Sequence, residues 1–221
     1  MPTEFVLATK TKTAPARHGG SGGRGAGRPN GDGAWPPREP AAPIPANTAL
    51  LGMAFALVAI AMLFVAFTTT YLGHRQEPGW TQIPLPWILW LDTGILLASS
   101  AAVEWGRRQL KRGDTMGFRR ALTAGGGLGV AFLVGQLLAW QQLVRQGVYL
   151  SSQPHSSFFY LLTGAHGVHL LGGLVAFAII LPRAWRGAYT PPGSVAVNVS
   201  STYWHFLTGL WLYVFIILFW M

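Results

Sequence analysis

Five long apolar stretches alternate with short polar segments along this chain. Each stretch is near the roughly 20 residues that a helix needs to cross about 30 Å of hydrocarbon. Strands of a membrane barrel would be about 10 residues long and would alternate apolar with polar positions. We therefore expect an all-α fold, an integral membrane bundle of five helices. The predicted spans are 47–72, 86–103, 122–144, 157–181 and 202–221.

Residues 1–46 differ from the rest because they are polar, basic and rich in Gly and Pro. Such a segment has too few apolar side chains to offset the entropy lost on ordering. We expect a disordered tail over 1–46, followed by one transmembrane domain over 47–221. A cleavable signal peptide is not expected, since the first apolar run starts far into the chain and is longer than a signal sequence core.

The composition agrees with a membrane protein. The chain of 221 residues is 51% hydrophobic and only 10% charged, whereas charged residues form about a quarter of an ordinary soluble domain. Cysteine is absent, which excludes disulfides, thiolate metal sites and thiol catalysis.

The basic residues predict the orientation in the membrane. Of the 16 Lys and Arg residues, only Arg75 and Arg145 fall on the side opposite the tail. The positive-inside rule then places the N-terminus and the even-numbered loops in the cytoplasm and the C-terminus outside, in the plasma (inner) membrane. The other fourteen are Lys10, Lys12, Arg17, Arg24, Arg28 and Arg38 in the tail, Arg107, Arg108, Lys111, Arg112, Arg119 and Arg120 after the second span, and Arg183 and Arg186 after the fourth.

This placement explains most of the net charge of +9 without a nucleic-acid partner. The alternative is that the basic tail or the second loop also docks anionic lipid or an acidic partner. Glycines that permit close helix approach are concentrated in the third and fourth spans, so we expect those two helices to pack closely. They are Gly125, Gly126, Gly127, Gly129 and Gly135, then Gly164, Gly167, Gly172 and Gly173.

Polar groups within the apolar spans are few, and each is a candidate for function because such groups are costly in a membrane. His166 and His169 are three residues apart, so they share roughly one face of the fourth span. A fold that packs the fifth span on this face would add His205 as a third histidine. Haem or metal ligation is one reading; the other is neutral histidines that bond between helices or contact lipid or a partner subunit.

Asp92 in the second span and Gln136 in the third are the remaining candidates for lipid or subunit contacts. Asp92 is either a proton-handling group or a structural hydrogen-bond acceptor, and the structural reading is favoured because no second carboxylate lies at matching depth. No phosphate-binding loop, nucleophile elbow or acid pair is present in the sequence. The residues alone indicate a non-catalytic bundle whose surface meets another membrane protein.

Two stretches resemble a known family. The fourth span, FFYLLTGAHGVHLLGG over 158–173, resembles the Phe-Phe-x-Leu-Thr-Gly-x-His-Gly-x-His element of subunit III of the haem-copper oxidases. The last span, YWHFLTGLWLYVFIILFW over 203–220, resembles that family's terminal Tyr-Trp-His-Phe run. Supporting likenesses are the Leu-Leu-x-Ser-Ser run ending at Ser100, the stretch from Gln136 to Trp140, and Gly52-Met53.

The resemblance implies the short, five-helix form of subunit III. Such a subunit binds no haem or copper itself; those cofactors are expected in the partner subunit I. It would pack against subunit I, in a complex with subunit II, support proton uptake and stability during oxygen reduction, and hold phospholipid. An accessory subunit of a nitric oxide reductase, which also resembles subunit III, and a small haem-binding membrane cytochrome are the alternatives.

Three positions depart from the family pattern. Family members often have Glu eight residues after the Gly-Met opening, Glu directly before the Trp of the third span, and Asp three residues after the last His. This chain has Ile60, Ala139 and Thr208 at those places. Any role that the family assigns to those carboxylates is therefore not carried over.

Overall fold

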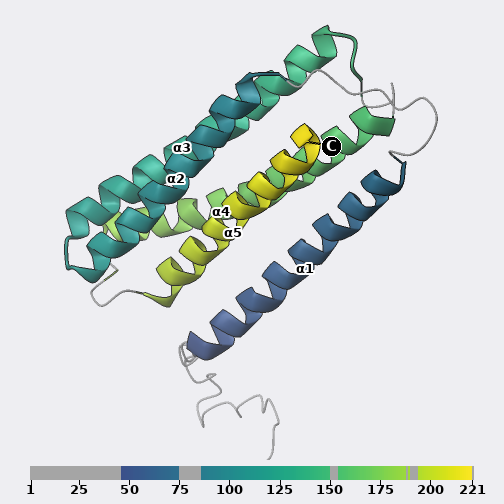
Figure 1. Ribbon diagram of the computed structural model, residues 1–221. Coiled ribbons are helices and arrows are strands. Elements are labelled where there is room, and N and C mark those ends of the chain that lie inside the picture. Colours follow the sequence, from purple (N-terminus) through teal and green to yellow (C-terminus); the bar gives the residue numbers. More distant parts are fainter. Residues whose placement is uncertain (1–45, 75–85, 150–153, 188, 190–193, 221) are drawn as a thin grey trace, which may run out of the picture. The chain divides into compact units, whose positions relative to one another are not determined.

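The computed structural model describes residues 46–74, 86–149, 154–187, 189 and 194–220. All five helices are long and apolar enough to cross a membrane, and no strand occurs in this part of the chain. The prediction of an all-α, five-helix membrane protein is confirmed. The tail predicted over 1–46 lies outside the described residues, except for Ala46. The helices are α1 (Ala46–His74), α2 (Ile88–Lys111), α3 (Thr115–Arg145), α4 (Pro154–Trp185) and α5 (Val195–Trp220) (Figure 1).

Four of the helices form a closed ring of contacts. Helix α2 packs on α3 and α5, and α4 packs on the same two, while α1 lies against α4 and α5 only (Figure 1). The buried residues of α1 are Phe64, Thr68 and Tyr71, whose spacing of four and three places them on one face. The other sides of α1 are open and apolar, as expected for a helix that faces lipid or another subunit.

Helices α2 and α3 form an antiparallel hairpin with a turn of three residues, Arg112 to Asp114. Gly113 has a left-handed conformation (φ 83°), which favours glycine and stops α2. Asp114 then caps α3, because its Oδ1 accepts a hydrogen bond of 2.8 Å from the backbone N–H of Gly117. The short turn places the last turns of α2 beside the first turns of α3.

The helices are longer than the predicted spans, and the prediction that several residues near the span ends lie in loops is wrong. Five of the six cations assigned to the second loop lie on α2 or α3, and only Arg112 is in the turn. Arg183 and Pro182, expected after the fourth span, belong to the last turns of α4. Apolarity marks only the hydrocarbon-spanning part of a helix, which continues into the headgroup region wherever its polar groups can be satisfied.

The expected packing of α3 on α4 is present, but α3 makes its more extensive contact with α2. The glycines explain this difference. A side chain at Gly125 would meet Val103 of α2, and one at Gly135 would overlap the Asp92 carboxylate of α2. Gly164 and Gly167 of α4 do face α3, but more loosely. The glycines of α3 therefore allow close packing of α2 at least as much as of α4.

Two buried tryptophans of α5 lie inside the ring. Trp204 Nε1 donates a hydrogen bond of 3.0 Å to Ser99 Oγ of α2, and Trp211 Nε1 donates one of 2.9 Å to Thr93 Oγ1 of the same helix. The ring of Trp204 also packs on Phe177 of α4, with centroids 4.6 Å apart. Since lipid tails are as apolar as the side chains, such shape complementarity and interhelical bonds hold the helices together.

Candidate functional site

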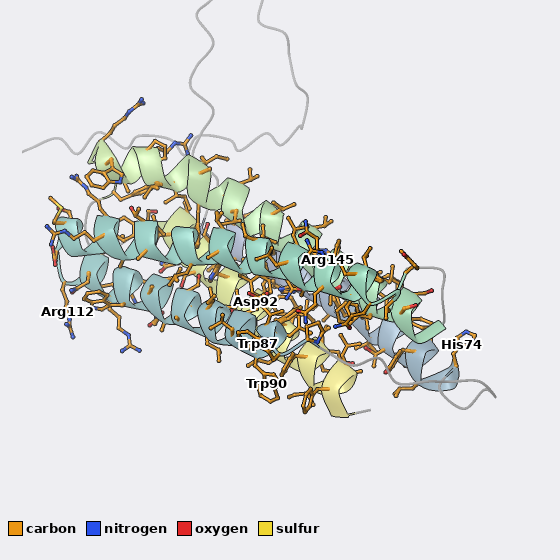
Figure 2. The ribbon with its side chains drawn as sticks, turned by 90° about the horizontal axis from the view of Figure 1, so that it is seen from above. His74, Trp87, Trp90, Asp92, Arg112 and Arg145 are labelled. Carbon is orange, nitrogen blue, oxygen red and sulfur yellow. The ribbon has the colours of Figure 1, made fainter. Side chains whose placement is uncertain are left out.

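Asp92 and Gln136 form a buried pair between α2 and α3. Gln136 Nε2 donates a hydrogen bond of 3.0 Å to Asp92 Oδ2. Both side chains are buried, and Gln136 Oε1 has no partner among the described residues. Figure 2 labels Asp92 close to Trp87 and Trp90, and both of those rings are exposed. The carboxylate is therefore an interhelical acceptor near the aromatic end of α2.

His166 is fully buried at the centre of the helix ring. Its imidazole lies between Phe132 of α3 and Trp211 of α5, at centroid distances of 5.8 Å and 5.0 Å. Neither ring nitrogen has a hydrogen-bond partner within the described helices and turns. Within this chain the side chain packs as an aromatic ring, and it does not reach the surface where lipid or another subunit would lie.

His169 lies one turn further along α4, where α1 and α5 approach. Its Nδ1 is 2.7 Å from the carbonyl oxygen of Ala165, and its ring meets Phe64 of α1 edge-on. The hydroxyl of Tyr203 in α5 donates to the His169 carbonyl at 2.9 Å. The side chain is only partly buried, so part of it faces outward.

His205 is the centre of a polar cluster between α2 and α5. Its Nδ1 lies 2.6 Å from Ser100 Oγ, and its Nε2 lies 3.3 Å from Ser201 Oγ and 3.5 Å from Glu104 Oε2. Glu104 is also paired with Arg107 and Arg108 of its own helix. About a third of the His205 side chain, 38%, is exposed.

The structure does not bring the three histidines together. His166 and His169 are on α4 near Trp211 and Phe64 respectively, whereas His205 faces α2. No group of three or more His, Cys, Asp or Glu side chains is placed to hold a metal ion in the part of the chain described. What the structure does join is Asp92 with Gln136, and His205 with Ser100 and Glu104.

The three positions that lack the family's acidic residues are accommodated without charge. Ile60 packs against the core from α1, and Ala139 is buried in α3. Thr208 is buried in α5 and donates to the carbonyl of Trp204 at 3.0 Å. Each of these side chains therefore packs without a charge, and the one that carries a polar group, Thr208, has a hydrogen-bond acceptor within its own helix.

Sequence reasoning missed the serine and threonine residues of α2. Thr93, Ser99 and Ser100 supply the hydroxyls that meet Trp211, Trp204 and His205 of α5. Thr93 and Ser99 are six residues apart and Ser99 and Ser100 are adjacent, so the three do not show the three- or four-residue spacing of a single helix face. Only Ser99 and Ser100 belong to the Leu-Leu-x-Ser-Ser resemblance, and the partners of all three hydroxyls lie more than 100 residues away in the chain.

Comparison with known proteins identifies the family. A family model described as cytochrome c oxidase subunit III matches residues 48–221. A protein of Mycobacterium tuberculosis (strain ATCC 25618 / H37Rv) named "Probable cytochrome c oxidase subunit 3" is 34% identical over 163 residues, 72% of this chain and 80% of that protein. "Cytochrome c oxidase subunit 3" of Corynebacterium diphtheriae is 34% identical over 164 residues, again 72% of this chain and 80% of the relative. The protein of that name from Synechocystis is 30% identical over 179 residues, 77% of this chain and 74% of the relative. With a family model that matches nearly the whole of the five-helix region, and relatives this similar along most of their length, the chain belongs to the cytochrome c oxidase subunit III family.

Proposed function

We propose that this chain packs against subunit I of a haem-copper terminal oxidase, in a complex that also contains subunit II, and supports proton uptake and stability during oxygen reduction. The family match over residues 48–221 carries the proposal. The printed names of the relatives favour an oxidase over the nitric oxide reductase alternative. Subunit III is the non-redox member of such a complex, so haem and copper belong to the partner.

Exposed apolar surface supports a partner within the membrane. The open sides of α1 carry Phe55 and Met62, each with 68% of its surface exposed, and Val58, with 56% exposed. Lipid or a neighbouring subunit covers such a surface in the membrane. Among the candidate contact residues, His169 and His205 are partly open, whereas Asp92, Gln136 and His166 are buried. We therefore assign the proposed lipid or subunit contacts to His169 and His205.

The experiment is a mild-detergent purification of the tagged chain from its native membrane, followed by an optical spectrum and an oxygen-uptake assay. Haem-copper absorption with oxygen uptake in the eluate is the expected result. A haem-free eluate without oxidase subunits would contradict the assembly. An eluate that reduces nitric oxide but not oxygen would favour the reductase alternative.

Two substitutions test the assigned contacts. We expect His169→Ala and His205→Ala to lower the yield of the complex or shorten its lifetime in turnover, while single-turnover oxygen reduction persists. Val168→Ala is the matched control, because Val168 adjoins His169 and is 67% exposed, with no polar group to lose. Normal yield and normal lifetime in both histidine variants would count against these contacts.

A further inference from the structure

A pocket of about 280 Å³ lies between the last turns of α2 and the first turns of α5. The lining residues are Glu104, Arg107 and Lys111 of α2, and Asn198, Ser201, Thr202 and His205 of α5. The three α2 residues are three, four or seven apart, as are Asn198, Thr202 and His205 of α5, so each set occupies one helix face. Two other pockets of this chain, which share Trp140 and Tyr160, are lined mainly by apolar and aromatic residues. The polar lining indicates a ligand other than an acyl chain.

The pocket carries surplus positive charge. The Glu104 carboxylate in the lining is neutralised by its own helix, because it accepts two bonds of 2.8 Å from Arg107 Nε and Nη2, and one of 2.9 Å from Arg108 Nε. Nη1 of Arg107 takes part in neither of its bonds to Glu104. Lys111 is exposed and has no ion-pair partner among the described residues. The pocket lining thus holds two cations, Arg107 and Lys111, and one carboxylate, which Arg107 and Arg108 already pair; both lining cations still have donors to offer.

Neutral donors face the same space from α5. The hydroxyl of Thr202 and the side-chain amide of Asn198 line the pocket opposite the cations. Arginine and lysine together with hydroxyl and amide donors are the groups that proteins use to bind phosphate oxygens. A phosphate group would therefore find both charge and hydrogen-bond donors here.

The depth of the pocket places it at the level of lipid headgroups. Trp105, which adjoins Glu104 in sequence, has 56% of its surface exposed, and exposed tryptophans of transmembrane helices concentrate at the membrane interface. The α2–α3 turn also begins directly after Lys111. Lipid phosphates lie in this layer, so a phosphate is available beside the pocket.

We propose that this α2–α5 pocket binds a phosphate group, presented by the headgroup of an anionic phospholipid in the adjoining leaflet. Its volume of about 280 Å³ is just below the roughly 300–1,000 Å³ of small-molecule sites, which suits one headgroup better than a segment of a partner protein. The proposal deepens the lipid contact assigned to His205 and rests on it, but it does not depend on assembly with an oxidase.

Native mass spectrometry of the purified full chain in detergent tests the proposal. The chain is titrated with phosphatidylglycerol, with phosphatidylcholine, and with phosphatidylglycerol in the presence of millimolar inorganic phosphate. Lys111→Gln is compared with Arg112→Gln, which removes a neighbouring cation that does not line the pocket. Thr202→Val is compared with Thr123→Val, an exposed threonine of α3 that bonds within its own helix.

We expect phosphatidylglycerol to bind more tightly than phosphatidylcholine, and inorganic phosphate to compete poorly. Lys111→Gln should weaken phosphatidylglycerol binding about fivefold, and Thr202→Val about two- to tenfold. Each control variant should bind nearly as the parent does.

Three results would overturn the proposal. Equal losses in Lys111→Gln and Arg112→Gln, with none in Thr202→Val, would mean attraction by general surface charge. Effective competition by inorganic phosphate would make a soluble phosphate the ligand. Unchanged phosphatidylglycerol binding in both Lys111→Gln and Thr202→Val would show that the lipid binds outside this pocket. Because the titration contains no other subunit, its failure would leave the proposed oxidase role standing.

Discussion

The indole N–H of Trp204 in α5 donates to Ser99 Oγ in α2 at 3.0 Å, and Ser99 Oγ in turn donates to the carbonyl of Gly125 in α3 at 2.7 Å. One serine therefore joins three helices of the ring. Both Trp204 and Ser99 are fully buried. No water reaches either group to replace the bond, so the indole N–H depends on this one hydroxyl.

Ser99→Ala should destabilise the chain by about 1–3 kcal/mol, because it leaves the buried indole N–H without an acceptor. Trp204→Phe removes the donor as well as part of the ring. The double variant Ser99→Ala/Trp204→Phe should lose less stability than the sum of the two single losses. The difference, about 0.5–1.5 kcal/mol, is the coupling energy of the bond. Unfolding followed by circular dichroism in mixed micelles measures all three. Strictly additive costs would show that the bond contributes nothing.

Gly129→Ala tests how closely α3 approaches the same tryptophan. A Cβ on Gly129 would lie 2.7 Å from two ring carbons of Trp204, and the rigid, buried ring cannot move aside. We expect a loss of about 1–3 kcal/mol from overpacking. Gly127→Ala on the same helix is the control, since nothing lies within 4 Å of its Cβ.

The control should be neutral, or more stable by about 0.5–1 kcal/mol, because alanine favours a helix more than glycine does. Equal stability of the Gly129 and Gly127 variants would show that the ring is less tightly held than its contacts indicate.

Hydrophobic length predicted the five helices but not their ends. The run of apolar residues in the second span stops near Val103, yet α2 continues to Lys111 because Glu104 pairs with Arg107 and Arg108 one turn further on. Such pairs stabilise the part of a helix that extends beyond the hydrocarbon core, and a search for apolar residues does not detect that part. The turn between α2 and α3 has a sequence signature, because Gly113 is a residue that ends helices and Asp114 is one that caps the start of the next.

The partners of the candidate residues were not predictable in the same way. The sequence shows that Gln136 and Asp92 are polar groups in apolar spans. Their contact, with Gln136 Nε2 3.0 Å from Asp92 Oδ2, depends on how α3 is rotated about its axis when it packs on α2. His166 and His169 share a helix with three-residue spacing, yet their rings meet different neighbours, Trp211 and Phe64. Helix rotation is set by packing, which single-residue patterns do not specify.

Gln136→Leu should cost about 1–3 kcal/mol of stability, because it leaves the buried Asp92 carboxyl without its hydrogen-bond donor. The double variant Asp92→Leu/Gln136→Leu should recover much of that loss, since replacing both members of a buried polar pair by apolar groups is often close to neutral. Thermal unfolding in detergent measures both. A double variant that is less stable than Gln136→Leu alone would show that Asp92 is needed for a reason other than this pair.

The orientation of the chain can be tested at the two ends of α3. Eight cations of the described helices and turns gather at the end that holds the α2–α3 turn, where Arg119 Nε also donates to Ala184 O of α4 at 2.9 Å. Figure 2 shows Arg112 at this end, with Arg145 and His74 towards the other. From the positive-inside rule we expect the α2–α3 turn to lie in the cytoplasm.

Single cysteines at Thr115 and Gln146 test this, because the parent chain contains no cysteine and is its own blank. Both positions are exposed, and both substitutions leave the charges unchanged. In intact cells, a membrane-impermeant maleimide should label Gln146→Cys and not Thr115→Cys, whereas inverted vesicles should reverse the pattern. Labelling of Thr115→Cys in intact cells, with Gln146→Cys protected, would invert the proposed topology and place the α2–α5 phosphate pocket in the outer leaflet.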